Sequence, residues 1–389
     1  MKKYLKKYLT RFSDLRGLAS IGIGDTLGSA VTALFWFFLA SQLSSESYGE
    51  IHYYLGIAGF AQIISLIGNS NILTVYAAKN IKIISTLFFI SLIAGFFSSL
   101  IVIILLTRID TGLLIFGYII MDLSNGVLLG RKLFKKYSAL ILLQKLLTIT
   151  LGIGFFYIFG EESIIFALVF SYLPYIHIIS KEIRIEKISL SQLKIRKGFI
   201  INNYFMNISG SFGGQIDKII IAPMLGFQLL GNYALALQFY VVLMMFSNIV
   251  YKYILSQDAS GNENKNLKKG ILLVSISISI LSAVFLPEII AQFFPQYIQT
   301  IDAVQIISFG IIPGTMTLIY NSKFLAVEKS KYVLMGKIFS IVITVVGFIV
   351  LGPIYGIVGL AIILIFALST EALFLTIVNK FGELKNVKK

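Results

Sequence analysis

The sequence predicts an all-α protein that crosses a membrane many times. Of its 389 residues, 57% are hydrophobic and only 13% are charged, whereas a soluble protein usually carries about a quarter charged residues. The mean hydropathy is +0.88. Only helices and closed barrels satisfy their backbone groups in lipid, and the long unbroken apolar runs are unlike the short alternating strands of a barrel.

The apolar runs give the number of helices. A spanning helix needs about 20 residues, and the sequence contains twelve runs of about that length. We expect spanning helices over residues 17–41, 49–78, 83–107, 112–130, 138–159, 163–180, 198–222, 232–255, 270–294, 301–322, 332–352 and 354–379. Little chain is left for loops, so a catalytic domain outside the membrane is excluded by space.

The basic residues predict the orientation. Of the 33 Lys and Arg, Arg108 and four lysines inside predicted spans are exceptions, and the other 28 lie in the two tails or in the loops after every second helix. Loops rich in Lys and Arg face the cytoplasm. We therefore expect both termini to be cytoplasmic, and we interpret the net charge of +15 as topology rather than as a nucleic-acid footprint. Contact with anionic headgroups is compatible with the same residues.

The absence of cysteine excludes disulfides and thiolate metal sites. No other metal site is expected, because His52 and His177 fall near opposite membrane faces. An interfacial position is the better interpretation of both histidines.

Two segments predict an internal repeat. Residues 39–51 read LASQLSSESYGEI, and residues 221–233 read IAPMLGFQLLGNY, at an offset of 182 residues. Gly49 then falls opposite Gly231, and both segments join the first two helices of a six-helix block. The loop pattern gives the same division: a bundle over 1–180, a cytoplasmic connector over 181–197 and a bundle over 198–389. Paired halves around a cavity are a common transporter design.

These segments carry a resemblance to a known family. Residues 37–72 read FFLASQLSSESYGEIHYYLGIAGFAQIISLIGNSNI, and residues 214–240 read GQIDKIIIAPMLGFQLLGNYALALQFY. They resemble the two signatures of Wzx-type polysaccharide flippases, of the multidrug/oligosaccharidyl-lipid/polysaccharide exporter superfamily. The second signature has an Asp followed by a base, then Gly and Tyr, here Asp217, Lys218, Gly231 and Tyr233.

The resemblance implies a fold and an activity. The fold is two six-helix bundles that form a V around a central cavity, and family members often have up to fourteen helices. The activity is translocation of undecaprenyl-pyrophosphate-linked oligosaccharide, for O-antigen or capsule, across the bacterial inner membrane by alternating access. It is not an enzymatic activity and needs no cofactor, although a proton or sodium gradient can drive it. Membrane lipid, a polysaccharide polymerase and a chain-length regulator are the implied partners.

Charged residues inside the spans are the candidate site residues, because a charge at the bilayer centre costs several kcal/mol and marks function by default. We predict that Lys218 and Lys145 bind the pyrophosphate. Lys252 and Lys337 lie within about two turns of a cytoplasmic end and are expected to snorkel to the interface.

A polar stripe is predicted along residues 198–222. Its members recur at i+4 spacing, which places them on one helix face before Lys218. They are the predicted sugar-binding residues Asn203, Asn207, Ser211 and Gln215. Hydrogen bonding between helices is the competing interpretation, and we favour a cavity lining because so long a stripe rarely finds partners throughout.

Four carboxylates are candidates for ion coupling or ion pairing: Asp217, Asp25, Asp122 and Glu371. For Asp217, a permanent pair with a lysine and a coupling role remain open alternatives. Asp25 lies beside Gly24 and Gly28, a pattern typical of close helix packing.

Other functions stay open. A multidrug exporter of the same superfamily would favour acidic residues in the cavity, and a lipid II flippase would carry buried arginines, of which the predicted spans hold none mid-membrane. An integral-membrane polysaccharide polymerase is the alternative from another class, but such enzymes usually need a large loop or a cluster of His, Asp and Arg at one face.

Overall fold

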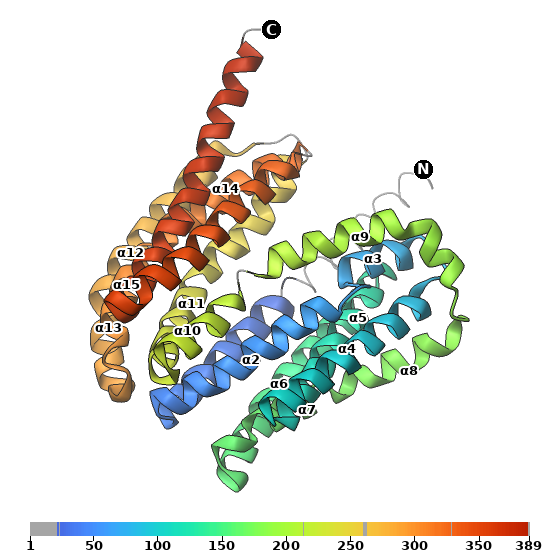
Figure 1. Ribbon diagram of the computed structural model, residues 1–389. Coiled ribbons are helices and arrows are strands. Elements are labelled where there is room, and N and C mark those ends of the chain that lie inside the picture. Colours follow the sequence, from blue (N-terminus) through green and yellow to red (C-terminus); the bar gives the residue numbers. More distant parts are fainter. Residues whose placement is uncertain (1–21, 23, 213, 260–262, 328, 388–389) are drawn as a thin grey trace. The chain divides into compact units, whose positions relative to one another are not determined.

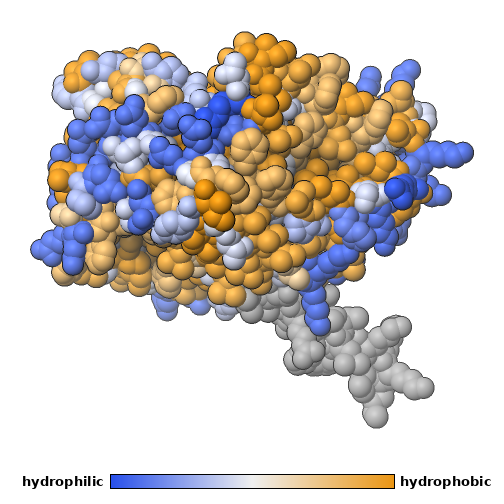
Figure 2. All heavy atoms as spheres, turned by 90° about the horizontal axis from the view of Figure 1, so that it is seen from below, coloured by the Kyte–Doolittle hydropathy of each residue, from blue (hydrophilic) through white to orange (hydrophobic). Residues whose placement is uncertain are grey.

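The structure is a computed structural model that describes residues 22, 24–212, 214–259, 263–327 and 329–387. Its secondary structure is helical (Figure 1). Among the described residues, seven helices are long and apolar enough to cross a membrane, or up to nine if each of two bent pairs counts as one span. Figure 2 shows hydrophobic residues over much of the face in view, as expected of a protein whose solvent is lipid. The all-α polytopic fold class is confirmed; the exact set of twelve spans stays a prediction.

The chain forms two compact units. Unit 1 comprises residues 1–35 and 57–211, and unit 2 comprises residues 36–56 and 212–389. The helix over residues 24–42 and the helix α2 (Ser45–Ser65) each contribute to both units. The predicted division into two six-helix bundles with a connector at 181–197 stays a prediction.

Unit 1 contains the remaining helices of the first half of the chain. Their bounds are α3 Ser70–Ala78, α4 Ile84–Leu106, α5 Ile109–Gly130, α6 Phe134–Phe159, η1 Glu161–Ser163, α7 Ile164–Ser171, η2 Leu173–Tyr175, α8 Ile176–Ile185 and α9 Leu190–Phe212. Helices α4, α5 and α6 are unbroken, as predicted. The predicted connector is largely helical, since only residues 186–189 separate α8 from α9.

Unit 2 contains the helices of the second half. Their bounds are α10 Ile216–Leu225, α11 Phe227–Ala259, α12 Lys265–Phe293, η3 Pro295–Tyr297, α13 Thr300–Ser308, α14 Ile311–Ala326 and α15 Ser330–Val387. The 58 residues of α15 are two helices joined at Gly356, whose φ of 55° and ψ of −136° are not helical. Contacts of Gly347 with Ile363 and of Gly336 with Leu375 show that the two arms run antiparallel, in agreement with predicted spans over 332–352 and 354–379.

Three predicted spans are interrupted instead of continuous. The 49–78 span bends by 41° between α2 and α3, and the 301–322 span bends by 41° between α13 and α14. At the first bend the Asn69 side chain accepts the N–H of Ile72 at 3.1 Å, and Asp122 on α5 accepts the N–H of Ser70 at 2.7 Å. These bonds satisfy donors that a helix start leaves unpaired. The third interruption separates α9 from α10.

A close crossing of α2 and α11 lies within unit 2. A Cβ on Gly49 would lie 1.9 Å from the carbonyl oxygen of Phe227, and a Cβ on Gly231 would lie 1.8 Å from that of Ser45. The contact is reciprocal, because the offset of 182 residues relates Ser45 to Phe227 and Gly49 to Gly231. The glycines that align in the predicted repeat therefore meet at one crossing, where only a residue without a side chain allows the backbones to approach.

The segment before this crossing is held to the rest of unit 2 by side chains near η3. Gln296 Nε2 donates to the carbonyl oxygens of Ala40 at 2.9 Å and Leu43 at 3.1 Å, and the Tyr297 hydroxyl donates to that of Leu43 at 3.2 Å. The Tyr48 ring lies edge-on to Tyr297, with centroids 5.8 Å apart. Residues 36–56 are thus anchored to unit 2 by hydrogen bonds as well as by packing.

A buried carboxyl group between α8 and α9 predicts that the stability of the protein depends on pH. Glu186 follows α8, and its Oε2 is buried without a hydrogen-bond partner. Burial raises the pKa of Glu186, although Arg131 and Lys82 act in the opposite direction. A carboxyl group whose pKa is raised by folding contributes to stability in its protonated form. This contribution is fully present below the ordinary pKa near 4.5 and is lost as the pH rises through the folded-state pKa. We expect Glu186→Gln to raise the melting temperature at pH 7.5 by an amount on the order of 1 °C.

The measurement is thermal unfolding of the detergent-solubilised protein at several pH values. The difference between Glu186→Gln and wild type should shrink toward pH 4, where the carboxyl is protonated in both states. Lys181→Gln, at an exposed position of α8, is the control for surface substitution. A Glu186→Gln effect that does not change with pH would show that the charge is not responsible.

Candidate functional site

The candidate site lies at the N-terminus of α10 in unit 2, where Asp217 and Lys218 are in the first helical turn. Asp217 lies in the first helical turn, a favourable place for an acid. Its side chain is 6% exposed, and its Oδ1 accepts the backbone N–H of Lys218 at 2.8 Å. The Lys218 ammonium donates to Gln215 Oε1 at 3.5 Å, and Asp217 is an electrostatic neighbour. Among the described residues Lys218 makes no ion pair.

A cavity of about 360 Å³ adjoins this pair, entirely within unit 2. Its polar lining comes from α2, α10, α11 and α15, and its apolar lining from α11 and α15. The residues are His52, Gly214, Asp217, Lys218, Tyr233, Ala234, Leu237, Gln238, Tyr240, Val241, Lys337, Ser340, Ile341, Thr344, Leu364 and Leu368. Gly56 on α2 packs against Lys218, since a Cβ added to this glycine would lie only 2.9 Å from the Cβ of the lysine.

Several polar atoms of the lining lack partners. Both ring nitrogens of His52 and the hydroxyl of Tyr233 are buried without a hydrogen bond. His52 is 7% exposed and lies between the rings of Trp36 and Tyr48, with centroids 4.8 and 4.5 Å away. Buried polar groups are paired in almost all native structures. These unpaired atoms beside a cavity therefore indicate a place where water or a polar ligand binds.

The first arm of α15 brings a second cation to the cavity. Lys337, Ser340 and Thr344 all line it, at a spacing that puts them on one helix face. Glu371, on the second arm, is 3% exposed and lies near Lys337 and Ser340. Lys337 therefore lines the cavity, together with its i+3 and i+7 neighbours, and its snorkelling to the interface stays a prediction.

Two of these lining residues were missed by sequence reasoning. Lys337 was detectable from its spacing to Ser340 and Thr344. The interfacial position expected for His52 stays a prediction, and the structure adds that aromatic rings bury this residue beside the cavity. Tyr48, four residues earlier on α2, was a local signal of this environment, whereas Trp36 comes from the helix over residues 24–42.

The predicted polar stripe is broken. Helix α9, with Asn203, Asn207 and Ser211, ends at Phe212, and α10 begins at Ile216 after the glycine-rich residues 213–214. Glycine is a poor helix former, which accounts for the interruption. The expectation of one continuous face is wrong: Asn203, Asn207 and Ser211 lie in unit 1, whereas Gln215 lies in unit 2. The Asn203 amide donates to its own helix, to the carbonyl of Phe199 at 3.0 Å.

The other predicted ionic residues lie in unit 1. Tyr137 donates to Asp25 Oδ1 at 3.3 Å, and Asp122 holds the N–H of Ser70 as described above. The Cγ of Lys145 on α6 would lie 3.5 Å from a Cβ added to Gly28. Among the described residues Lys145 makes no ion pair or hydrogen bond. Asp122 therefore has a structural contact that the sequence did not suggest.

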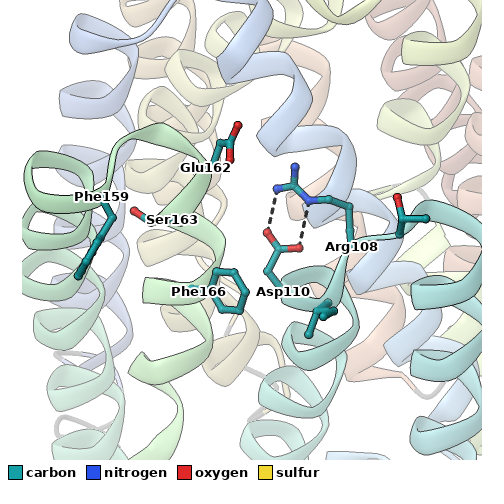
Figure 3. Close-up of a pocket in the computed structure, with 8 residues that line it drawn as sticks. Arg108, Asp110, Phe159, Glu162, Ser163 and Phe166 are labelled. Atoms are coloured by element: carbon teal, nitrogen blue, oxygen red, sulfur yellow. Dashed lines mark hydrogen bonds and ion pairs between the residues drawn. The ribbon is translucent and has the colours of Figure 1, made fainter.

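A further cavity, of about 430 Å³, lies in unit 1 (Figure 3). Arg108 donates to Asp110 through Nε at 3.1 Å and through Nη2 at 2.8 Å, and Glu162 and Phe166 line the opposite side. The backbone N–H and the hydroxyl of Thr111 also bond to Asp110. The Arg108 cation, just before α5, is thus neutralised by Asp110 in the first turn of that helix, whereas Lys218 makes no ion pair with a described residue.

The cavity beside Lys218 can bind an anion together with hydroxyl groups. Lys218 and Lys337 supply positive charge in surroundings of low polarity, where electrostatic interactions are stronger than in water. The hydroxyls of Tyr233, Ser340 and Thr344 and the amide of Gln238 supply donors and acceptors. Among the described residues, no three His, Asp or Glu side chains gather to hold a metal ion.

Comparison with known proteins identifies the fold. No protein-family model and no curated protein matches the sequence. The structure is similar to that of the lipid II flippase MurJ in an inward closed conformation, with a TM-score of 0.76 and 14% identity over 92% of this chain and 87% of that chain. It is also similar to an inward-facing multidrug resistance MATE family transporter of the MOP superfamily, with a TM-score of 0.72 and 16% identity over 94% and 96%. The chain therefore has the fold of these membrane transporters.

Proposed function

We propose that this chain is a flippase for a lipid-linked, phosphate-bearing oligosaccharide. The observation that carries the proposal is the Lys218 ammonium, which lies without an ion pair to any described residue beside a partly polar cavity in unit 2. A cation inside the membrane costs free energy, so its presence there indicates a functional role. The pyrophosphate of a polyprenyl carrier would form the ion pair that this ammonium lacks, and the fold shared with a lipid II flippase supports a substrate of this kind.

The specific substrate that we propose is an undecaprenyl-pyrophosphate-linked repeat unit of O-antigen or capsule. The protein carries it from the cytoplasmic to the outer leaflet of the bacterial inner membrane by alternating access of two six-helix bundles, with both termini cytoplasmic. Lys218 and Lys337 bind the pyrophosphate in unit 2, and Lys145 is the proposed phosphate-binding residue of unit 1. Asn203, Asn207, Ser211 and Gln215 remain the proposed sugar contacts, joined by Gln238 and Tyr233. A polysaccharide polymerase and a chain-length regulator are the proposed downstream partners.

Coupling to an ion gradient is part of the proposal. Asp217 and Glu371 lie close to the cavity lysines, and Asp25 and Asp122 offer carboxylates in unit 1. A proton or sodium ion taken by one of these groups would change the charge seen by the pyrophosphate. The same carboxylates favour a second candidate, a multidrug exporter, because carboxylates attract cationic compounds and because the fold is shared with a multidrug resistance MATE family transporter.

The test is removal of the protein from its host, with lipid-linked oligosaccharides and surface polysaccharide both assayed. We expect intact undecaprenyl-linked repeat units to accumulate on the inner leaflet and surface polymer to be lost, with both restored by the wild-type gene. Single repeat units that reach the surface unpolymerised would instead identify a polymerase. Unchanged polysaccharide with altered drug tolerance, or accumulation of lipid II, would overturn the proposed substrate in favour of those alternatives.

A further inference from the structure

A third cavity, of about 370 Å³, lies in unit 1 between the end of α3 and the first half of α9. It is separate in composition from the site around Lys218, with which it shares no residue. Its lining combines two cations with aromatic and aliphatic side chains and contains no carboxylate: Val75, Tyr76, Lys79, Ile81, Ile195, Arg196, Gly198 and Phe199.

Arg196 is held in place without its charge being neutralised. Its guanidinium carbon lies 5.7 Å from the centroid of the Tyr76 ring, and that ring is 5.5 Å from the ring of Phe199. An arginine stacked on an aromatic face keeps its N–H groups available in the plane. The Arg196 Nε is buried and has no hydrogen-bond partner. Among the described residues Arg196 makes no ion pair.

Lys79 adds a second cation at the same cavity. It directly follows α3 and is exposed, and it too makes no ion pair with any described residue. Elsewhere in unit 1 the arginines of similar burial are neutralised: Arg131 donates to both oxygens of Glu182, at 2.6 and 2.5 Å, and Arg108 is paired with Asp110. The cavity at Arg196 therefore differs from the surroundings of Arg108 and Arg131, because no carboxylate lines it to neutralise its cations.

We propose that this cavity binds the phosphate group of a lipid at the cytoplasmic face. The planar guanidinium fits two phosphate oxygens, Lys79 adds a point charge, and the exposed side chains of Ile195 and Phe199 provide an apolar surface for the adjoining chains. The neighbouring Lys and Arg of the predicted cytoplasmic loops attract anionic headgroups to this side. The phosphate comes either from an anionic phospholipid or from a polyprenyl-phosphate carrier, and the experiment separates the two.

The experiment measures binding of lipids to the purified full-length protein in detergent by native mass spectrometry. The probes are phosphatidylglycerol, undecaprenyl phosphate and, as a zwitterionic comparison, phosphatidylethanolamine. We expect Arg196→Gln and Lys79→Gln each to weaken binding of an anionic lipid about fivefold, the usual effect of one cation near an anionic headgroup. Arg184→Gln, an exposed arginine on α8 outside the cavity, removes the same charge and should change binding less than about twofold.

The outcomes separate the two possible sources of the phosphate and also test the proposal itself. Loss of phosphatidylglycerol binding alone identifies a bulk-lipid site, and loss of undecaprenyl phosphate binding alone identifies a carrier site. Equal losses in Arg184→Gln and Arg196→Gln, or equal affinity for all three lipids, would overturn the proposal in favour of diffuse surface charge. Lys79→Gln at an exposed position keeps the test valid if Arg196→Gln impairs folding. The proposal does not depend on the proposed substrate, because the phospholipid result stands whether or not the protein is a flippase.

Discussion

Replacing Gly231 with alanine is expected to prevent α2 and α11 from meeting and to destabilise the protein strongly. The added Cβ would lie 1.8 Å from the carbonyl oxygen of Ser45, a backbone atom that cannot rotate away. Overpacking a tight contact costs about 1–3 kcal/mol and occasionally more, and a backbone clash this close belongs at the upper end. Gly49→Ala should have a similar effect, because its Cβ would lie 1.9 Å from the carbonyl oxygen of Phe227.

The control is alanine at helical glycines with free space. A Cβ added to Gly154 on α6 or to Gly270 on α12 would have no atom within 4 Å. Alanine is the better helix former by up to about 1 kcal/mol, so Gly154→Ala and Gly270→Ala should be neutral or stabilising. The measurement is yield and melting temperature in detergent for the four variants. Similar behaviour of all four would show that the crossing is looser than the structure has it.

This crossing illustrates how far the sequence reaches. The alignment of residues 39–51 with 221–233 predicted that Gly49 and Gly231 are equivalent, and the structure adds that they touch. Hydropathy also placed the cores of α4, α5, α6, α11 and α12 correctly, since long apolar runs have one solution in lipid. The bend at Asn69 was missed because it involves a tertiary contact, that of Asp122 with Ser70, which no local pattern reveals.

The candidate site was predicted in part for the same reason. Lys218 and Asp217 were identified because charge inside an apolar run is visible in the sequence. Lys337 was left out of the predicted site because its distance from a helix end was weighed above its helical neighbours, and the structure shows that it lines the cavity. The polar stripe failed because helical periodicity was continued past Phe212, where α9 ends. Sequence patterns thus found the charged residues, while the packing of α10 and α15 decided which of them share a cavity.

Lys218 gives the prediction with the largest functional effect. Its ammonium lies in the protein interior without a carboxylate within ion-pair distance among the described residues. Burying such a charge lowers the stability of the folded protein, and we propose that the lysine is retained because it binds the pyrophosphate. We therefore expect Lys218→Met to lower transport of lipid-linked oligosaccharide about 10- to 100-fold, since a charge-assisted hydrogen bond contributes about 1.5–3 kcal/mol.

The same substitution should raise stability while it lowers transport. Methionine fills most of the volume of lysine without a charge to bury, so the melting temperature of Lys218→Met should equal or exceed that of the wild type. Asp217 keeps its bond from the backbone N–H of residue 218, which any side chain at that position preserves. Lys218→Arg retains the charge and should keep part of the activity, and Lys181→Met, at an exposed position on α8, should affect neither quantity. If Lys218→Met lowered transport and melting temperature together, Lys218 would instead have a structural role, because removing a lysine that stabilises the fold cannot raise the melting temperature.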